Sequence, residues 1–489
     1  MKPIYPFMGI AALCSIPSQA QEKPNFLIIQ CDHLTQRVVG TYGETKGCTD
    51  AIDRVAAQGV IFANAYVGCP LSQPSRSALW SGMMPHQTNV RSNSDTPLNP
   101  LLPESIPTLG SLFSESGYDA VHFGKTHDMG SLRGFKHKEP VAKPFKDPDF
   151  PVNKDSFLDV GTCEDAVTYL SNPPEEPFIC IADFQNPHNI CGYVGENKGV
   201  HTNTPIRGSL PELPANFEVA DWNNVPQPVQ FICCSHRRMT QAAPWSEDNY
   251  RHYIAAFQHY TKMVSKQIDS VLKALYSTPA GRNTIVVILA DHGDGMASHR
   301  MVTKQISFYE EVTNVPFIIA GPGIKQQAKP IDKLLTQPTI DLLPTLCDLA
   351  GINVPAEKPG ISLVPTLTGK KQTKTHPYAV SEWHSEYEVI TSPGRMIRGP
   401  RYKYTHYLEG NGEELYDLKT DKGERTNLAK DPKFAKVLAE HRAMLDDYIV
   451  RTKDDYRTLK VDADKQWRNH MPGYPFHTGP GGADVQQSK

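Results

Sequence analysis

The chain has 489 residues, which is enough for one large domain and a smaller one, and its composition is that of an ordinary soluble globular protein. The formal net charge of -3 argues against a surface that binds polyanions through its overall field, and no basic stripe of the nucleic-acid-binding kind is present. An anionic substrate would therefore have to be recognised by a local cationic pocket.

The first twenty residues predict a cleaved secretory signal. Lys2 is followed by an apolar stretch over residues 7–16 and then by Ser18-Gln19-Ala20, a small-x-small cleavage site. The stretch is too short to span a bilayer, and no later segment resembles a membrane span. We therefore expect a secreted, periplasmic protein that is cleaved near Ala20. A disordered start to a cytosolic protein is the alternative.

Four short apolar runs predict buried strands, and long stretches with helical character separate them. The runs are residues 26–29, 178–182, 285–290 and 317–320, and the clearest helical stretch is residues 250–276. Continuous apolar runs that alternate with helices are typical of a largely parallel sheet covered on both faces. We therefore predict an α/β domain over residues 21–375, built on a large, mixed, mostly parallel sheet sandwiched by helices.

Three of these runs lead directly into polar residues. In open α/β sheets the ligand site lies beyond the carboxyl ends of the strands. Asp and Gly can simply terminate strands, but three ends that carry metal-ligand chemistry predict one shared site. The residues at these ends are Cys31-Asp32-His33, Asp183 with Asn186-Pro187-His188, and Asp291-His292-Gly293.

The character of the chain changes after about residue 375. Short strands are predicted at residues 396–398 and 402–404. The segment 414–418 follows, and then a helix is predicted over residues 432–450. These elements indicate a smaller C-terminal α+β domain at residues 376–461. The tail, residues 462–489, is rich in Pro, Gly and polar residues and is expected to be an extended arm or partly disordered.

The cysteines do not predict a disulfide framework. Of the ten, Cys14 would leave with the signal, and the odd number that remains cannot all pair. None has a C-x-x-C spacing. We expect most of them to be buried and reduced.

The segment at residues 69–79 reads Cys-Pro-Leu-Ser-Gln-Pro-Ser-Arg-Ser-Ala-Leu. Pro74 and the small residues after it suit the first turn of a helix. Ser72 would then face backbone N–H groups and the positive end of the helix dipole, with Arg76 as a fixed cation, and both favour a bound anion. The alternative is a plain helix cap with a solvated arginine.

This segment resembles the signature of the sulfatase family, in which Cys or Ser is followed by x-Pro-Ser-Arg. Asn64-Ala65-Tyr66 and Ser81-Gly82 also resemble the family, and matching elements continue in the family's order from about Lys23 to about Val450. The resemblance implies an alkaline-phosphatase-like fold. It also implies that a serine-type maturating enzyme oxidises Ser72 to formylglycine, because Cys69 lies three positions too early.

Two further segments resemble the metal-binding parts of the family. Residues 25–33 resemble its first strand, which normally ends in Asp-Asp, and residues 289–293 resemble its other metal segment. The resemblance implies calcium, bound by Asp32, Asp291, His292 and an oxygen of modified Ser72. His33 replaces the second Asp and either ligates the metal or supports a ligand. Calcium prefers oxygen donors, so two histidines would weaken its binding or change the metal preference.

Three motifs resemble the sulfate pocket of the family. Gly124-Lys125-Thr126-His127 implies that Lys125 holds the sulfate and that His127 is the base. Asn186-Pro187-His188 implies that His188 protonates the leaving oxygen. Lys304 precedes Phe308-Tyr309-Glu310-Glu311 at a spacing one residue longer than usual, and it would neutralise sulfate together with Arg76 and Lys125.

These parts together imply a sulfatase that acts on a sulfated saccharide, such as a glycosaminoglycan or a mucin-type glycan. We expect no nucleic-acid partner and no membrane span. Two alternatives remain open. One is a phosphatase or phosphodiesterase of the same superfamily that uses the Ser72 alkoxide, and the other is an inactive, glycan-binding protein on a sulfatase scaffold.

Overall fold

The structure is a computed structural model. It describes residues 23–460 except 44, 46, 94–98, 145–156, 198–208, 219–223, 227, 231–236, 243, 305–306 and 385–392. The predicted secretory signal and the predicted tail lie outside the described residues.

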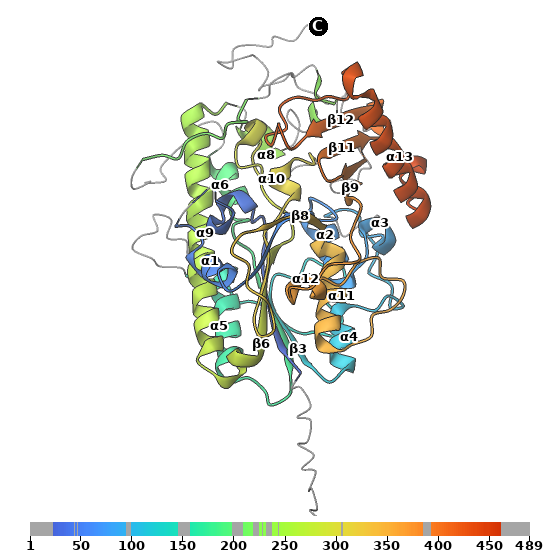
Figure 1. Cartoon of the computed structure of the whole chain (residues 1–489). Helices are drawn as coiled ribbons and strands as arrows, with labels where there is room; N and C mark the ends of the chain where they lie inside the picture. The colour runs from blue at the N-terminus through green and yellow to red at the C-terminus, as the bar shows by residue number, and fades with distance from the viewer. Residues whose placement is uncertain are drawn as a thin grey trace, which may run out of the picture.

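A sheet of eight strands forms the centre of the described chain (Figure 1). All of its strand pairs are parallel except those of β7, which runs antiparallel to β6 and to β2. The predicted mixed, mostly parallel sheet is therefore confirmed. In spatial order the strands are β4 (Lys136–Lys138), β3 (Asp119–Gly124), β5 (Phe178–Phe184), β1 (Asn25–Cys31), β6 (Thr284–Ala290), β7 (Phe317–Ala320), β2 (Gly59–Ala65) and β8 (Ile331–Thr336).

Helices cover both faces of this sheet (Figure 1). The side chains of β1 alternate between two apolar cores, as the two-residue period of a strand requires. Leu27 and Ile29 face the first group of helices, α1 (Asp50–Ala56), α5 (Leu158–Ser171), α6 (Ile190–Glu196), α8 (Arg237–Ala242) and α9 (Glu247–Tyr276). Phe26 and Ile28 face the second group, α2 (Ser72–Ser81), α4 (Leu109–Glu115), α11 (Pro338–Ala350) and α12 (Val364–Leu367).

A second, antiparallel sheet of four strands follows in the chain. Its order is β12 (Gly412–Asp417), β11 (Tyr402–Tyr407), β10 (Gly394–Arg398) and β9 (Ala379–Trp383), and α13 (Ala435–Thr452) packs against it. Its apolar core includes Met84, which precedes α3 (Pro85–Thr88), and Ile340 from α11, so it is continuous with the large domain. The boundary at residue 376 stays a prediction.

The seven cysteines in the described part of the chain are all unpaired.

None of the helices that the structure describes is both long and apolar enough to cross a membrane.

The register of the central strands determines where the polar residues emerge. Cys31, the last residue of β1, pairs with Phe184 of β5 on one side and with Ala290 of β6 on the other. Gly124, the last residue of β3, pairs with Asp183. The segments after these four strands therefore leave the sheet at the same edge.

Candidate active site

The three strand ends that the sequence singled out do converge, and β3 adds a fourth. The backbone N–H of Asp32 donates to Phe184 O (3.1 Å), and that of Lys125 donates to Asp183 O (3.0 Å), so each segment is fixed to its neighbour as it leaves the sheet. Parallel strands in register thus bring together chemistry from residues far apart in the sequence.

Ser72 is fully buried at the start of α2, close to where the sequence predicted a helix. Its Oγ lies 2.7 Å from Lys304 Nζ and 2.9 Å from His292 Nε2, and it lies 3.4 and 3.5 Å from the two carboxylate oxygens of Asp32. A cation, an imidazole and a carboxylate therefore surround this hydroxyl. The longer spacing before Tyr309 does not remove Lys304 from the site.

Arg76 lies one turn further along α2 and joins the strand ends. Its Nε donates to Asp291 Oδ2 (2.9 Å), its Nη1 donates to Asp183 Oδ2 (2.5 Å), and its Nη2 is 3.6 Å from Asp32 Oδ2. Burial alone would lower the pKa of Arg76, but the three carboxylates outweigh burial and raise it. The guanidinium is thus permanently charged and holds α2 to β1, β5 and β6.

The predicted metal ligands lie together beside Ser72. Ligand atoms of Asp32, His33 and His292 fall within 4.8 Å of one another, and all three residues are buried. Asp291 stands next to them, with Oδ1 accepting the backbone N–H of His33 (3.3 Å) and that of His292 (2.9 Å). The sequence left open whether His33 ligates a metal, and the structure places its ring in this group.

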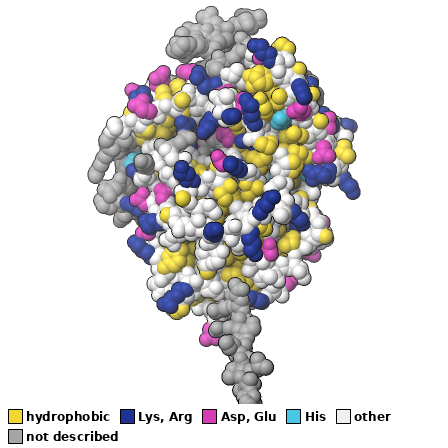
Figure 2. All heavy atoms as spheres, in the orientation of Figure 1, with side chains coloured by type: hydrophobic (Ala, Val, Ile, Leu, Met, Phe, Trp, Pro, Cys, Tyr) yellow, Lys and Arg dark blue, Asp and Glu magenta, His cyan; other side chains and the backbone are white. Residues whose placement is uncertain are grey.

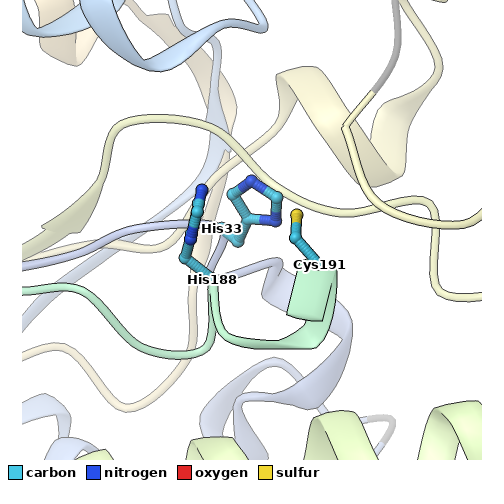
Figure 3. A group of neighbouring side chains, drawn as sticks. All are labelled: His33, His188 and Cys191. Carbon is cyan, nitrogen blue, oxygen red and sulfur yellow. The ribbon is translucent and has the colours of Figure 1, made fainter. Parts of the chain in front are cut away.

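His33 has an unusual backbone conformation, with φ of 72°. This left-handed region is uncommon for residues with a side chain and is often found at functional sites. Figure 3 shows the His33 ring between the His188 ring and the thiol of Cys191. These three side chains also offer ligand atoms within 4.8 Å of one another, so His33 belongs to two groups.

Lys125, His127 and His188 form the more accessible side of the site. Lys125 makes a short contact with Asp32 Oδ2, and its side chain remains 17% exposed. Burial first, and Lys125 second, lower the pKa of His127 to about 3 and hold that of His188 well below its usual value. Both imidazoles are therefore neutral before an anion arrives, and an anion would raise both pKa values.

Several residues of the site were missed by sequence reasoning. Asp183 was noted only as the end of a strand, yet it is the closest carboxylate to Arg76. Asp294 accepts from His33 Nδ1 (3.3 Å) and from the hydroxyl of Tyr253 (2.6 Å). The position of Asp294, three residues after the Asp291 strand end, was the available signal. Tyr253 and Cys191 lie on helices, and no sequence pattern pointed to either of them.

A cavity of about 450 Å³ lies beside this site. Its wall includes Gln73, Lys125 and His127, so a ligand in this cavity would reach the half-buried side chains of Lys125 and His127. A larger cavity of about 990 Å³ lies against the second sheet instead and does not include Ser72. Figure 2 shows basic and acidic side chains interspersed over the visible face, in keeping with the small net charge.

Comparisons with known proteins agree with this geometry. The family model Sulfatase matches residues 24–352, and the model of the C-terminal part of N-sulphoglucosamine sulphohydrolase matches residues 297–451. A Delta 4,5-hexuronate-2-O-sulfatase of Bacteroides thetaiotaomicron is 81% identical over 482 residues, covering 99% of this chain and all of that protein.

Solved structures extend the comparison. The structure of a 2-O GAG sulfatase matches with a TM-score of 0.90 and 81% identity, covering 95% of this chain and 100% of that chain. The phosphonate monoester hydrolase of Agrobacterium radiobacter matches with a TM-score of 0.73 and 20% identity, covering 89% and 97% of the two chains. At that identity the second match shows a shared fold alone.

Proposed function

The chain belongs to the sulfatase family, and we propose that it removes the 2-O-sulfate group from Δ4,5-unsaturated hexuronate in fragments of glycosaminoglycans. As a member of this family it is an enzyme, a sulfuric ester hydrolase. The observation that carries the choice of substrate is the 81% identity to a Delta 4,5-hexuronate-2-O-sulfatase, which extends over 99% of the chain. The match extends over nearly the whole chain and therefore covers the segments that carry the site residues.

The cations beside Ser72 supply the sulfate pocket. Lys304 Nζ lies 2.7 Å from Ser72 Oγ, and Lys125 lies next to Asp32 on the accessible side. Fixed positive charges in a site that excludes water stabilise the charge that grows on the sulfate oxygens in the transition state. The nitrogens of Arg76 face carboxylates, so its main part is to hold these groups in position.

We propose that Ser72 is converted to formylglycine by a serine-type maturating enzyme. Its buried position at the start of α2 supports this, because backbone N–H groups there favour an oxyanion. Formylglycine supplies a hydrated aldehyde, in which one hydroxyl attacks sulfur and the other allows the sulfate to be expelled. A serine hydroxyl alone is a weak nucleophile at neutral pH.

The two remaining histidines are assigned to proton transfer. His188, on the segment after β5, would donate a proton to the departing sugar oxygen. His127, on the segment after β3, would accept the proton that is lost when sulfate leaves. The lowered pKa of His127 keeps this ring neutral and able to accept a proton, whereas His188 gains the proton that it donates when the anionic ester binds and raises its pKa.

The donors around Ser72 fit the calcium that the family resemblance implies only in part. The carboxylates of Asp32 and Asp291 suit that ion, but the imidazoles of His33 and His292 do not, because calcium takes oxygen ligands. The roles proposed for the lysines and for His127 and His188 do not depend on the identity of the metal.

The proposed activity is tested by sulfate release from a glycosaminoglycan disaccharide that carries 2-O-sulfated, Δ4,5-unsaturated hexuronate. Three comparison substrates are used. The first is the same disaccharide sulfated only on the hexosamine, the second is the 2-O-sulfated disaccharide with a saturated uronate, and the third is an aryl phosphate. We expect release only from the disaccharide with 2-O-sulfated, Δ4,5-unsaturated hexuronate, and only after co-expression with a serine-type maturating enzyme. Ser72→Ala should lower the rate by about 10³-fold or more, whereas Ser77→Ala, a buried neighbour on α2, should retain it.

Two outcomes would contradict the proposal. Phosphate release without the maturating enzyme would favour a phosphatase that uses the Ser72 alkoxide. Release of sulfate only from the hexosamine would support a sulfatase activity and refute the proposed substrate.

We further propose export to the periplasm because residues 1–20 have the pattern of a secretory signal, and cell fractionation would test this.

A further inference from the structure

We propose that the metal of this site is zinc, bound by Asp32 Oδ1, His33 Nε2 and His292 Nε2, with an oxygen derived from Ser72 as the fourth ligand. This inference rests on the proposed function, in which an oxygen formed from Ser72 attacks sulfur. It differs from the calcium that the family resemblance implies.

The available oxygen atoms are too few for calcium, which takes six to eight oxygen ligands. Asp32 offers one, because Oδ2 is held by Lys125 and lies 3.6 Å from Arg76. Both oxygens of Asp291 are engaged, Oδ2 with Arg76 Nε and Oδ1 with two backbone N–H groups. A catalytic zinc site, by contrast, needs three protein ligands and one open position.

The two histidines are oriented as metal ligands are. A histidine that ligates a metal donates its other ring N–H to a carboxylate or a carbonyl. His33 Nδ1 lies 3.3 Å from Asp294 Oδ2, which in turn is fixed because Asp294 Oδ1 accepts from Tyr253 and from a backbone N–H. His292 Nδ1 lies 2.8 Å from Gly293 O. The Nε2 of His33 is thus left without a hydrogen-bond partner, and that of His292 faces Ser72 Oγ (2.9 Å), the oxygen proposed as the fourth ligand.

The Nε2 atoms point at one place. His33 Nε2 lies 3.7 Å and His292 Nε2 lies 3.5 Å from Asp32 Oδ1, and His33 Nε2 is fully buried with no hydrogen-bond partner. Ligands of a tetrahedral ion at about 2.0–2.1 Å lie roughly 3.3 Å apart. The spacing therefore accepts a single ion, and the donor types select zinc.

The neighbouring group of His33, His188 and Cys191 also has zinc-binding chemistry (Figure 3). An ion there would leave His292 Nε2 and Asp32 without a role, and it would occupy His188, which the proposed function needs free. His188 and Cys191 are also less buried than Asp32 and His292. The observations therefore favour the group that includes Ser72.

The test is elemental analysis of the full, maturase-treated chain, followed by removal of the metal and titration with Zn²⁺, Ca²⁺ and Co²⁺. We expect about one zinc per chain. Four-coordinate Co²⁺ should give intense visible absorption bands, and His33→Asp and His292→Asn should abolish these bands. Asp294→Asn should weaken Zn²⁺ binding by about 10–100-fold, since it acts through His33. His33→Asp should gain affinity for Ca²⁺, and Cys191→Ser should keep the zinc.

Calcium in the purified chain, with no competition from Zn²⁺, would overturn the inference. Loss of zinc in Cys191→Ser but not in His292→Asn would also overturn it, by placing the ion in the neighbouring group. The release assay on the same samples separates this result from the proposed function. Zinc without 2-O-sulfate release would support the metal inference and refute the substrate, whereas release by a calcium-loaded chain would refute the metal inference alone.

Discussion

His188 is the side chain whose proposed role can be separated most cleanly from binding. We expect His188→Asn to lower kcat on the saccharide ester by about 10²–10⁴-fold, because the departing sugar oxygen then leaves without a proton. The loss should be much smaller on an aryl sulfate, since a phenolate leaves unprotonated. Steady-state kinetics on both substrates check this, and equal losses on the two would assign His188 to binding instead.

Single residues differ in how far their roles could be predicted. The location in the site could be predicted for residues at the start of a helix or the end of an apolar run, namely Ser72, Asp32 and Asp291. The pairing of Arg76 with three strand ends could not, because it depends on β1, β5 and β6 being adjacent in the sheet. The support of His33 by Asp294 likewise depends on a fold that brings positions 261 residues apart into contact.

The segment after β6 packs so closely against α10 (Glu310–Thr313) that a side chain at Gly293 has no room. A Cβ there would lie 1.9 Å from Glu311 O. We expect Gly293→Ala to push this segment away from α10, lowering stability by about 1–3 kcal/mol and kcat by about 100-fold through displacement of His292. Chemical unfolding and the release assay measure the two effects.

Gly192 in α6 provides the matched control, because a Cβ there would meet nothing within 4 Å. Gly192→Ala should leave the activity unchanged and raise stability by about 0.4–1 kcal/mol, since it restricts the unfolded chain. A Gly293→Ala variant as active and as stable as Gly192→Ala would show that α10 yields to the added methyl group.

Most of the predicted helices and strands match the structure where the pattern was strong. The runs at 26–29, 178–182 and 285–290 lie within β1, β5 and β6, and 317–320 coincides with β7. The reversed direction of β7 could not be read from its apolar run, because such a run looks the same in either direction. Pro344 lies inside α11, at a position where sequence rules would end a helix.

The large domain is joined to the second sheet by a buried charge pair, His86–Glu382, as well as by a common apolar core. His86 Nδ1, on α3, lies 2.6 Å from Glu382 Oε1, on β9, and Arg395, on β10, pairs with Asp454 beyond α13. Burial alone would lower the pKa of His86, but the Glu382 carboxylate outweighs burial and raises it. Glu382 in turn has a lowered pKa, since His86 and Arg395 outweigh its burial.

These shifts predict how the contact between α3 and the second sheet depends on pH. The raised pKa of His86 means that its contribution is complete below the unfolded value of about 6.5 and is lost as pH rises through the folded value. Glu382 remains charged throughout this range because its pKa is lowered. His86→Gln should therefore cost about 2 kcal/mol near pH 6, and clearly less near pH 9.

Unfolding by urea at the two pH values, for the wild type and for His86→Gln, measures the difference. The groups around His86 are Glu382, the ring of Tyr448, the carbonyl of Thr452, the nearby charges of Arg395 and Asp454, and Arg91 and His384, which line the same small cavity. Glu382 keeps its charge between these pH values because its pKa is lowered to about 2, and Tyr448 and His384 stay neutral because burial raises the pKa of the first and lowers that of the second to about 3. The change can therefore be assigned to His86. A cost that stays constant with pH would mean that His86 is neutral in the folded chain and joins α3 to the second sheet without an ion pair.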